Sequence, residues 1–138
     1  MIKTIVVGYD ETEASRRALE RAAALARAFE SKLVVTSVAP VTVTASARSI
    51  GADPVETGAE HREELAQARA YLDGEGLSAD YVEALGHEAE SILEVARERS
   101  ADMIVVGSRE VSGLQRLMGQ SVSNAVAHGA RCDVLIVH

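Results

Sequence analysis

The stretch "KTIVVGYDETEASRRALERAAALARAFESKLVVTSV", residues 3–38, sets the fold class. It begins with an apolar run that ends at Gly8 and Asp10, which predicts a buried strand. Residues 13–29 then follow the helical period, and a second apolar run occupies residues 31–38. The side chains expected on the inner face of the helix are Ala18, Leu19, Ala22, Ala26 and Phe29. A strand, a helix and a second strand in this order predict a βαβ crossover and a parallel sheet.

The same alternation continues along the chain. The further predicted strands are residues 78–85, 101–108 and 132–138, and the further helices are residues 59–74, residues 86–100 and a last short helix ended by Gly129. Five buried strands alternating with four helices predict an α/β fold, a five-stranded parallel sheet between helices on both faces. We expect one domain over residues 1–138.

Residues 39–58 form a long connection with a proline near each end and no sustained period. Long connections of this kind are usually functional or mobile. The sequence leaves two interpretations open, a lid over a ligand site and a plain disordered loop.

Composition narrows the classes of partner. The net charge of −7 repels the phosphates of nucleic acid and offers no basic face to anionic lipid, so neither nucleic acid nor a membrane is an expected partner. Aromatic residues make up only 3% of the chain, which predicts an aliphatic core. The single cysteine, Cys132, excludes an internal disulfide and fits a reducing compartment. The first apolar run is too short for a signal peptide or a membrane span, so we expect a cytoplasmic protein.

Ligands of open parallel sheets bind beyond the carboxyl ends of the strands, at the point where the strand order reverses. The residues that this rule selects are Tyr9, Asp10, Val38, Val106, Gly107 and Ser108. A carboxylate at Asp10 either caps the following helix or accepts hydrogen bonds from a ribose or a base.

The stretch "GSREVSGLQRLMGQSVS", residues 107–123, follows a strand and leads into a helix opened by Ser121, Val122 and Ser123. A helix N-terminus with free N–H groups is a ready anion site, although a serine there can also be a simple N-cap. The only cations of the segment, Arg109 and Arg116, either reach a phosphate or lie on the surface as solvated charges.

No catalytic constellation is evident. The four histidines have no partner at metal-ligand spacing, and neither a Ser-His-Asp arrangement nor a Walker A loop is present. Cys132 stands among apolar residues, which is typical of a buried core position. We therefore expect a protein that is not an enzyme and that needs no metal.

Three stretches together resemble the universal stress protein family, single-domain type. They are "IVVGYDETEASRRALERAAALA", "GHEAESILEVARERSADMIVVGS" and "SGLQRLMGQSVSNAVAHGARCDVLIV", and they cover essentially the whole chain. The resemblance implies a Rossmann-like fold of the nucleotide-binding α-hydrolase type and a role in the stress response. It also implies a homodimer formed through the last strand, Val134 to Val137, and protein partners that the sequence does not identify.

In nucleotide-binding members the phosphate loop contains Gly, two residues, Gly, nine residues, and Gly followed by Ser or Thr. Gly107 and Ser121 match this pattern, whereas Glu110 and Gln120 replace its second and third glycines. The resemblance also implies nucleoside contacts at Asp10, Val38, Val106 and Gly107, phosphate contacts at Gln120 and Ser121, and positions beside the last phosphate contacts for Val122 and Ser123. Tyr9, from the rule for open sheets, and Arg109, as a nearby cation, complete the candidate site. We expect a site for ATP or AMP in which tight ATP binding is impaired, since Glu110 repels phosphate. The alternative is a family member that binds no nucleotide and acts as a dimeric protein-interaction module.

Overall fold

The computed structural model of the chain describes residues 1–39, 54–108 and 122–138. The strands are β1 (Thr4–Gly8), β2 (Lys32–Ala39), β3 (Ala79–Leu85), β4 (Met103–Gly107) and β5 (Asp133–Val137). The helices are α1 (Glu13–Phe29), α3 (Pro54–Gly74), α4 (Glu88–Glu98) and α6 (Val122–Gly129).

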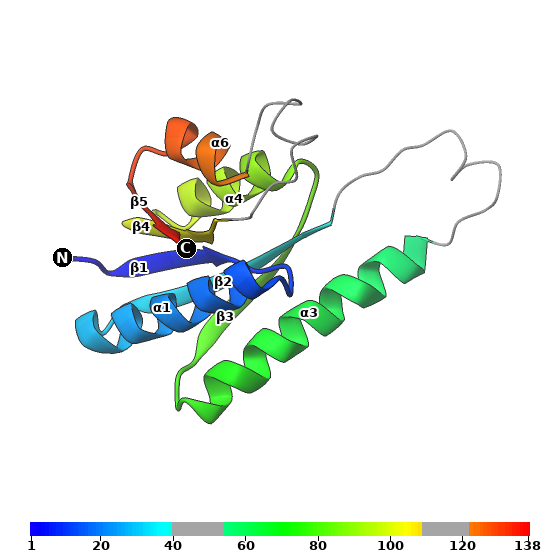
Figure 1. The fold of residues 1–138 in the computed structure, drawn as a ribbon, viewed down its shortest axis with the longest axis horizontal. Coiled ribbons are helices and arrows are strands. Elements are labelled where there is room, and N and C mark those ends of the chain that lie inside the picture. Colours follow the sequence, from blue (N-terminus) through cyan, green and yellow to red (C-terminus); the bar gives the residue numbers. More distant parts are fainter. Residues whose placement is uncertain (40–53, 109–121) are drawn as a thin grey trace.

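All five strands are parallel and their order in the sheet is β3-β2-β1-β4-β5. Helices α1 and α3 cover one face of the sheet, and α4 and α6 cover the other (Figure 1). The predicted fold class is therefore confirmed. The order reverses between β1 and β4, so the carboxyl ends of these strands form the switch point at which such sheets bind ligands.

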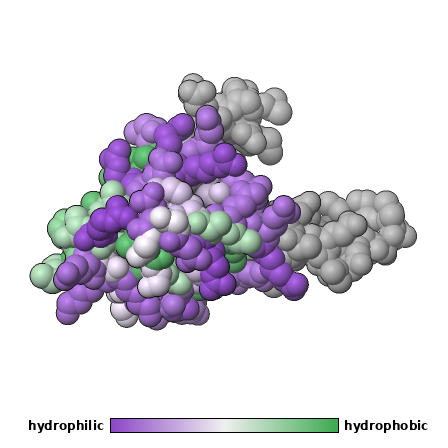
Figure 2. Space-filling view, turned by 90° about the horizontal axis from the view of Figure 1, so that it is seen from below, coloured by the Kyte–Doolittle hydropathy of each residue, from purple (hydrophilic) through white to green (hydrophobic). Residues whose placement is uncertain are grey.

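The core consists of two aliphatic layers separated by the sheet. Ile5 and Val7 of β1 face α1 and α3, while Val6 between them faces α4. Tyr9 is the one aromatic side chain among the described residues that are buried, as the low aromatic content predicts. In the view of Figure 2 the surface is mainly hydrophilic, and its hydrophobic residues are interspersed with hydrophilic ones. No helix within the described ranges has the length and apolar character needed to cross a membrane.

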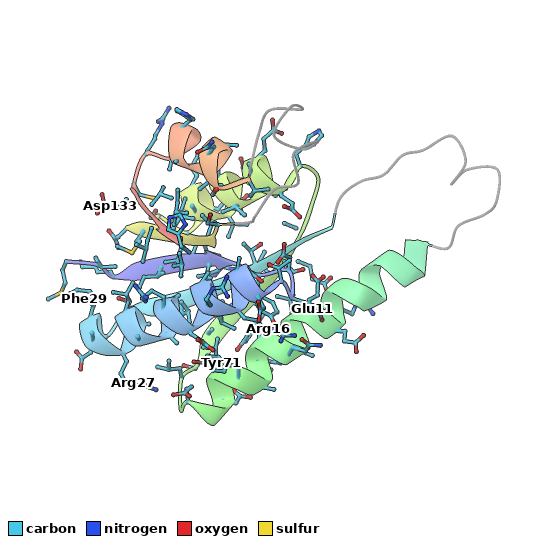
Figure 3. The ribbon with its side chains drawn as sticks, in the orientation of Figure 1. Glu11, Arg16, Arg27, Phe29, Tyr71 and Asp133 are labelled. Carbon is cyan, nitrogen blue, oxygen red and sulfur yellow. The ribbon has the colours of Figure 1, made fainter. Side chains whose placement is uncertain are left out.

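Phe29 does not join the inner face of α1, contrary to the prediction. Its side chain is 45% exposed, and it lies at the end of the helix in Figure 3. The buried face of α1 ends one turn earlier, at Ala26. After Phe29 the chain leaves the helix through Glu30, which has a left-handed conformation and donates its N–H to the Ala26 carbonyl.

One further prediction about a helix end is corrected, and one is confirmed. Helix α3 begins at Pro54 and not at residue 59, because proline suits the first helical position, where its missing N–H is not needed. The expected connection of residues 39–58 is thus shortened at both ends, and residues 40–53 lie outside the described ranges. Gly129 ends α6 without a positive φ; a Cβ there would lie 2.5 Å from Leu93 Cδ1, so this glycine allows α6 to pack closely on α4.

Cys132 precedes β5 and is only partly buried, although it was expected in the core. It packs against the layer formed by α4 and α6. Burial, together with the nearby negative charge of Asp133, raises the pKa of its thiol.

Candidate functional site

A hollow opens at the carboxyl ends of β1 and β4, at the switch point of the sheet. The predicted site residues in its wall are Tyr9, Asp10, Val106, Gly107 and Val122. They come from the turn after β1, from β4 and from the start of α6, so the fold brings together segments that are far apart in the sequence. The hollow has a volume of about 40 Å³, which is enough for ordered water but much less than a nucleoside.

The other predicted site residues are not in this wall. Ser123 is buried near the start of α6. Val38 lies in β2, but its side chain is outside the described part of the structure. The phosphate-loop residues Arg109, Glu110, Arg116, Gln120 and Ser121 all fall within residues 109–121, which lie outside the described ranges.

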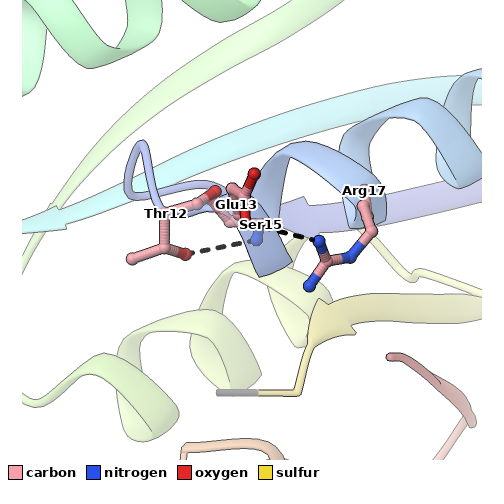
Figure 4. A network of polar contacts seen from close by, with 4 residues as sticks. All are labelled: Thr12, Glu13, Ser15 and Arg17. Atoms are coloured by element: carbon pink, nitrogen blue, oxygen red, sulfur yellow. Dashed lines mark hydrogen bonds and ion pairs between the residues drawn. The ribbon is translucent and has the colours of Figure 1, made fainter. Parts of the chain in front are cut away.

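The turn between β1 and α1 forms the rim on one side of the hollow. Thr12 is the N-cap of α1, and its Oγ1 accepts a hydrogen bond from the Ser15 amide at 3.2 Å (Figure 4). The Ser15 hydroxyl in turn donates to the Thr12 carbonyl at 3.0 Å. The first of these bonds satisfies the Ser15 amide, which lies in the first helical turn and has no intrahelical partner.

Asp10 does not cap α1, because the helix begins at Glu13 and its cap is Thr12. The Asp10 carboxylate instead accepts hydrogen bonds from the Thr12 amide at 3.1 Å and the Thr12 hydroxyl at 2.6 Å. Between the two residues, Glu11 has a φ of 66°, a conformation that few side chains adopt. Asp10 therefore fixes the cap residue and places a carboxylate at the mouth of the hollow.

Gly107 ends β4 where the strand meets the first turn of α1. A Cβ on this glycine would lie 2.4 Å from the Ala14 carbonyl carbon and 2.8 Å from the Ser15 amide nitrogen. Only glycine allows the two backbones to approach this closely. The same residue type that the phosphate-loop pattern requires here is thus also required by packing.

Thr36 belongs to the wall but was missed in the sequence. It lies in β2, opposite Gly8 of β1 in the strand register, and it is completely buried. Its Oγ1 has no hydrogen-bond partner. The available signal was a hydroxyl within the apolar run "KLVVTSV", which does not by itself distinguish a ligand contact from a core residue.

The described wall is acidic. It contains two carboxylates, Asp10 and Glu88, and neither lysine nor arginine among the described residues. Carboxylate oxygens are acceptors and suit the hydroxyl and amino groups of a ligand. Within the described ranges no three His, Cys, Asp or Glu side chains gather in a way that could hold a metal ion.

The fold is that of an open α/β protein with a hollow at the carboxyl edge of its sheet, and the comparisons with known proteins specify the class. The sequence profile of the universal stress protein family matches residues 1–138, and the chain belongs to that family. It is 33% identical to the universal stress protein YxiE of Bacillus subtilis, over 99% of both chains.

Two solved structures of similar proteins contain adenine nucleotides. One is a universal stress protein in complex with cAMP, 29% identical, with a TM-score of 0.70 over 99% of this chain and 97% of the other. The second is the universal stress protein from Archaeoglobus fulgidus in complex with dAMP, 26% identical, with a TM-score of 0.72 over the full length of both chains.

Proposed function

We propose that this chain is a non-enzymatic stress-response protein that binds an adenine nucleotide, ATP or AMP, at the carboxyl edge of its sheet. The observation that carries the proposal is the hollow at the switch point, which Asp10, Val106 and Gly107 line. The similar proteins with cAMP and dAMP support the choice of an adenine ligand.

The chemistry of the wall favours a ligand with few phosphates. Asp10 and Glu88 offer acceptors to the hydroxyls of a ribose, but they repel a triphosphate that lies close to them. Glu110, which replaces a glycine of the family's phosphate loop, adds a further negative charge to that segment. We therefore propose that AMP binds better relative to ATP than in relatives that keep all three glycines.

In this proposal Arg109, Gln120, Ser121, Val122 and Ser123 hold the phosphate, while Tyr9, Asp10 and Val38 hold the nucleoside. The assignment follows the resemblance in sequence, except that Tyr9 comes from the rule for open sheets and Arg109 is included as a nearby cation. Replacing both Glu110 and Gln120 with glycine tests it, because the double variant then regains tight ATP binding. Unchanged ATP affinity in that variant contradicts the assigned phosphate loop.

The second candidate function is protein interaction without a nucleotide. Two observations favour it. The volume of about 40 Å³ is far below the 300–1,000 Å³ typical of ligand pockets, and the Asp10 carboxylate is already hydrogen-bonded to Thr12. On this view the hollow keeps the family's shape while the partners are other proteins.

Both candidates include a homodimer formed through β5. This strand pairs with β4 along one edge, and Val134, Leu135 and Ile136 are only partly buried in the single chain. An edge strand of this kind is a natural pairing surface. Light scattering over a range of concentrations tests the proposal, which fails if the protein remains a monomer throughout.

The function is tested by mass spectrometry of the purified native protein, followed by calorimetric titration with AMP and ATP. A co-purifying adenine nucleotide, or binding of added AMP, supports the first candidate. We expect Asp10→Asn to weaken AMP binding, with Asp133→Asn, on an exposed residue of β5, as the matched control. An empty protein that binds neither nucleotide at millimolar concentration refutes the first candidate and leaves the second.

We propose that ligand occupancy is coupled to the connection after β2, so that nucleotide changes the rate at which a protease cleaves within residues 40–53. The proposed lid function of this connection fails if AMP binds and the cleavage rate does not change.

A further inference from the structure

The unpartnered hydroxyl of Thr36 sets it apart from the other buried polar residues. Its side chain is completely buried, and its Oγ1 has no hydrogen bond. A buried hydroxyl without a hydrogen bond destabilises the folded chain unless a ligand or a water supplies the missing partner. The position is also in the wall of the hollow, so a bound molecule has a route to it.

The next residue provides an internal comparison. Ser37 is equally buried, but its hydroxyl donates a 2.7 Å hydrogen bond to Glu64 Oε2 on α3. Successive residues of a strand point to opposite faces, so Thr36 is turned toward α4 and the hollow. The protein thus satisfies the buried hydroxyl on the closed face of β2 and leaves the one beside the hollow without a partner.

We infer that Thr36 contacts the ligand, and that its hydroxyl forms a hydrogen bond with the base of a bound purine nucleotide. This inference rests on the proposed function and identifies a residue that contacts the base. No described protein group competes for this hydroxyl, so it is available both to donate to a ring nitrogen and to accept from an amino group.

The strand order identifies the base as the part of the ligand that reaches Thr36. The proposed phosphate-binding segment follows β4, on one side of β1, whereas Thr36 lies in β2 on the other side. Between β4 and β2, Gly8 of β1 lines the hollow with backbone atoms only, because glycine has no side chain. A nucleotide that spans the hollow with its phosphate beyond β4 therefore directs its nucleoside end toward β2.

Entry of a base requires a side chain of α4 to move. A Cβ built on Gly8 would lie 3.0 Å from Ile92 Cδ1, so the tip of Ile92 packs over this part of the wall. The tip of an isoleucine can change rotamer, whereas the backbone atoms around Gly107 cannot. The hollow is small, but a ligand that displaces the tip of Ile92 can widen it near Thr36.

The test uses Thr36→Val, which keeps the shape of the side chain and removes only the hydroxyl. The matched control is Thr4→Val. Thr4 is the first residue of β1, at the end of the strand away from Gly8, and it does not line the hollow. Calorimetric titration with AMP is expected to give an affinity about 3- to 10-fold lower for Thr36→Val than for the wild type, the range for one neutral hydrogen bond. Thr4→Val is expected to bind as the wild type does.

A second variant separates a ligand contact from a purely structural effect. Thr36→Ser restores the hydroxyl and is expected to recover most of the AMP affinity. Urea unfolding without ligand is expected to show Thr36→Val at least as stable as the wild type, because valine removes an unpartnered polar group.

The inference is overturned if Thr36→Val binds AMP as tightly as the wild type, or if Thr36→Ser is weakened as much as Thr36→Val. In both cases the wild type binds AMP, so the proposed function stands. A wild type that binds neither AMP nor ATP removes the proposed function and this inference with it.

Discussion

Replacing Gly107 with alanine perturbs the contact between β4 and α1 on which the hollow is built. The added Cβ would lie 2.4 Å from the Ala14 carbonyl carbon, 2.5 Å from its oxygen and 2.8 Å from the Ser15 nitrogen. An ordinary contact begins at 3.4 Å, so the shortfall at the carbonyl carbon is about 1.0 Å (3.4 − 2.4). All three atoms are backbone, and no rotamer change relieves the overlap.

The variant therefore folds only if α1 or the end of β4 moves by about 1 Å. Overpacking of a close-packed interior costs about 1–3 kcal/mol, and we expect the upper end because backbone must shift. Alanine also gains about 0.5–1 kcal/mol over glycine within a strand, which is too little to cancel the overlap. The expected net loss of unfolding free energy is about 2 kcal/mol.

Urea unfolding followed by circular dichroism measures this loss. Gly74→Ala is the matched control: a Cβ at this last residue of α3 meets no atom within 4 Å, so we expect no loss and a gain of up to about 1 kcal/mol. If Gly107→Ala is within about 0.5 kcal/mol of the wild type, a value typical of neutral surface changes, the packing role assigned to Gly107 is wrong.

Three further predictions concern single residues outside the hollow. Glu30→Gly is expected to raise the unfolding free energy by about 0.5–1 kcal/mol, because Glu30 has a φ of 55° that glycine adopts freely; a loss of stability in urea would contradict this. Hydrogen bonds from the Thr4 and Lys3 amides lower the pKa of Asp102 below its ordinary value of 3.8. The contribution of Asp102 to the unfolding free energy is therefore complete above that pH, and it is lost as the pH falls through the lower pKa of the folded state. Asp102→Asn is therefore expected to flatten the fall of unfolding free energy below pH 4, and equal slopes in the two proteins would refute the assignment. Because burial raises the pKa of the Cys132 thiol, iodoacetamide is expected to react with it more slowly at pH 8 in the folded protein than in urea, and equal rates would show that the thiol is not protected.

The strands could be predicted from the sequence because parallel strands covered on both faces appear as continuous apolar runs. The runs that gave β1 and β4 are short and are bounded by glycine or charged residues, so even their ends were nearly right. The start of α3 could not be found in this way. Residues 54–58, "PVETG", combine a proline and a glycine and have no apolar period, although proline is compatible with a first helical turn.

The site could be predicted in position but not in detail. The rule for open sheets located Asp10, Val106 and Gly107 at one edge, because it depends only on topology. Which of Asp10 and Thr12 caps α1 depends on where the helix begins, and both are good capping residues. The state of Thr36 depends on what β1 and α4 place around its hydroxyl, which no local pattern of residues encodes.

Strand β1 is the first of the five strands in the sequence, yet it lies in the middle of the sheet, with β2 on one side and β4 on the other. The wall of the hollow accordingly draws Asp10 and Thr36 from the first part of the chain, and Ile92 and Val106 from the second. A nascent chain that has emerged only as far as β3 has half of this wall. Because the wall also includes Val122 of α6, we expect the proposed ligand to associate with the protein only after translation has passed the start of α6, so that binding follows biosynthesis and does not assist its early stages.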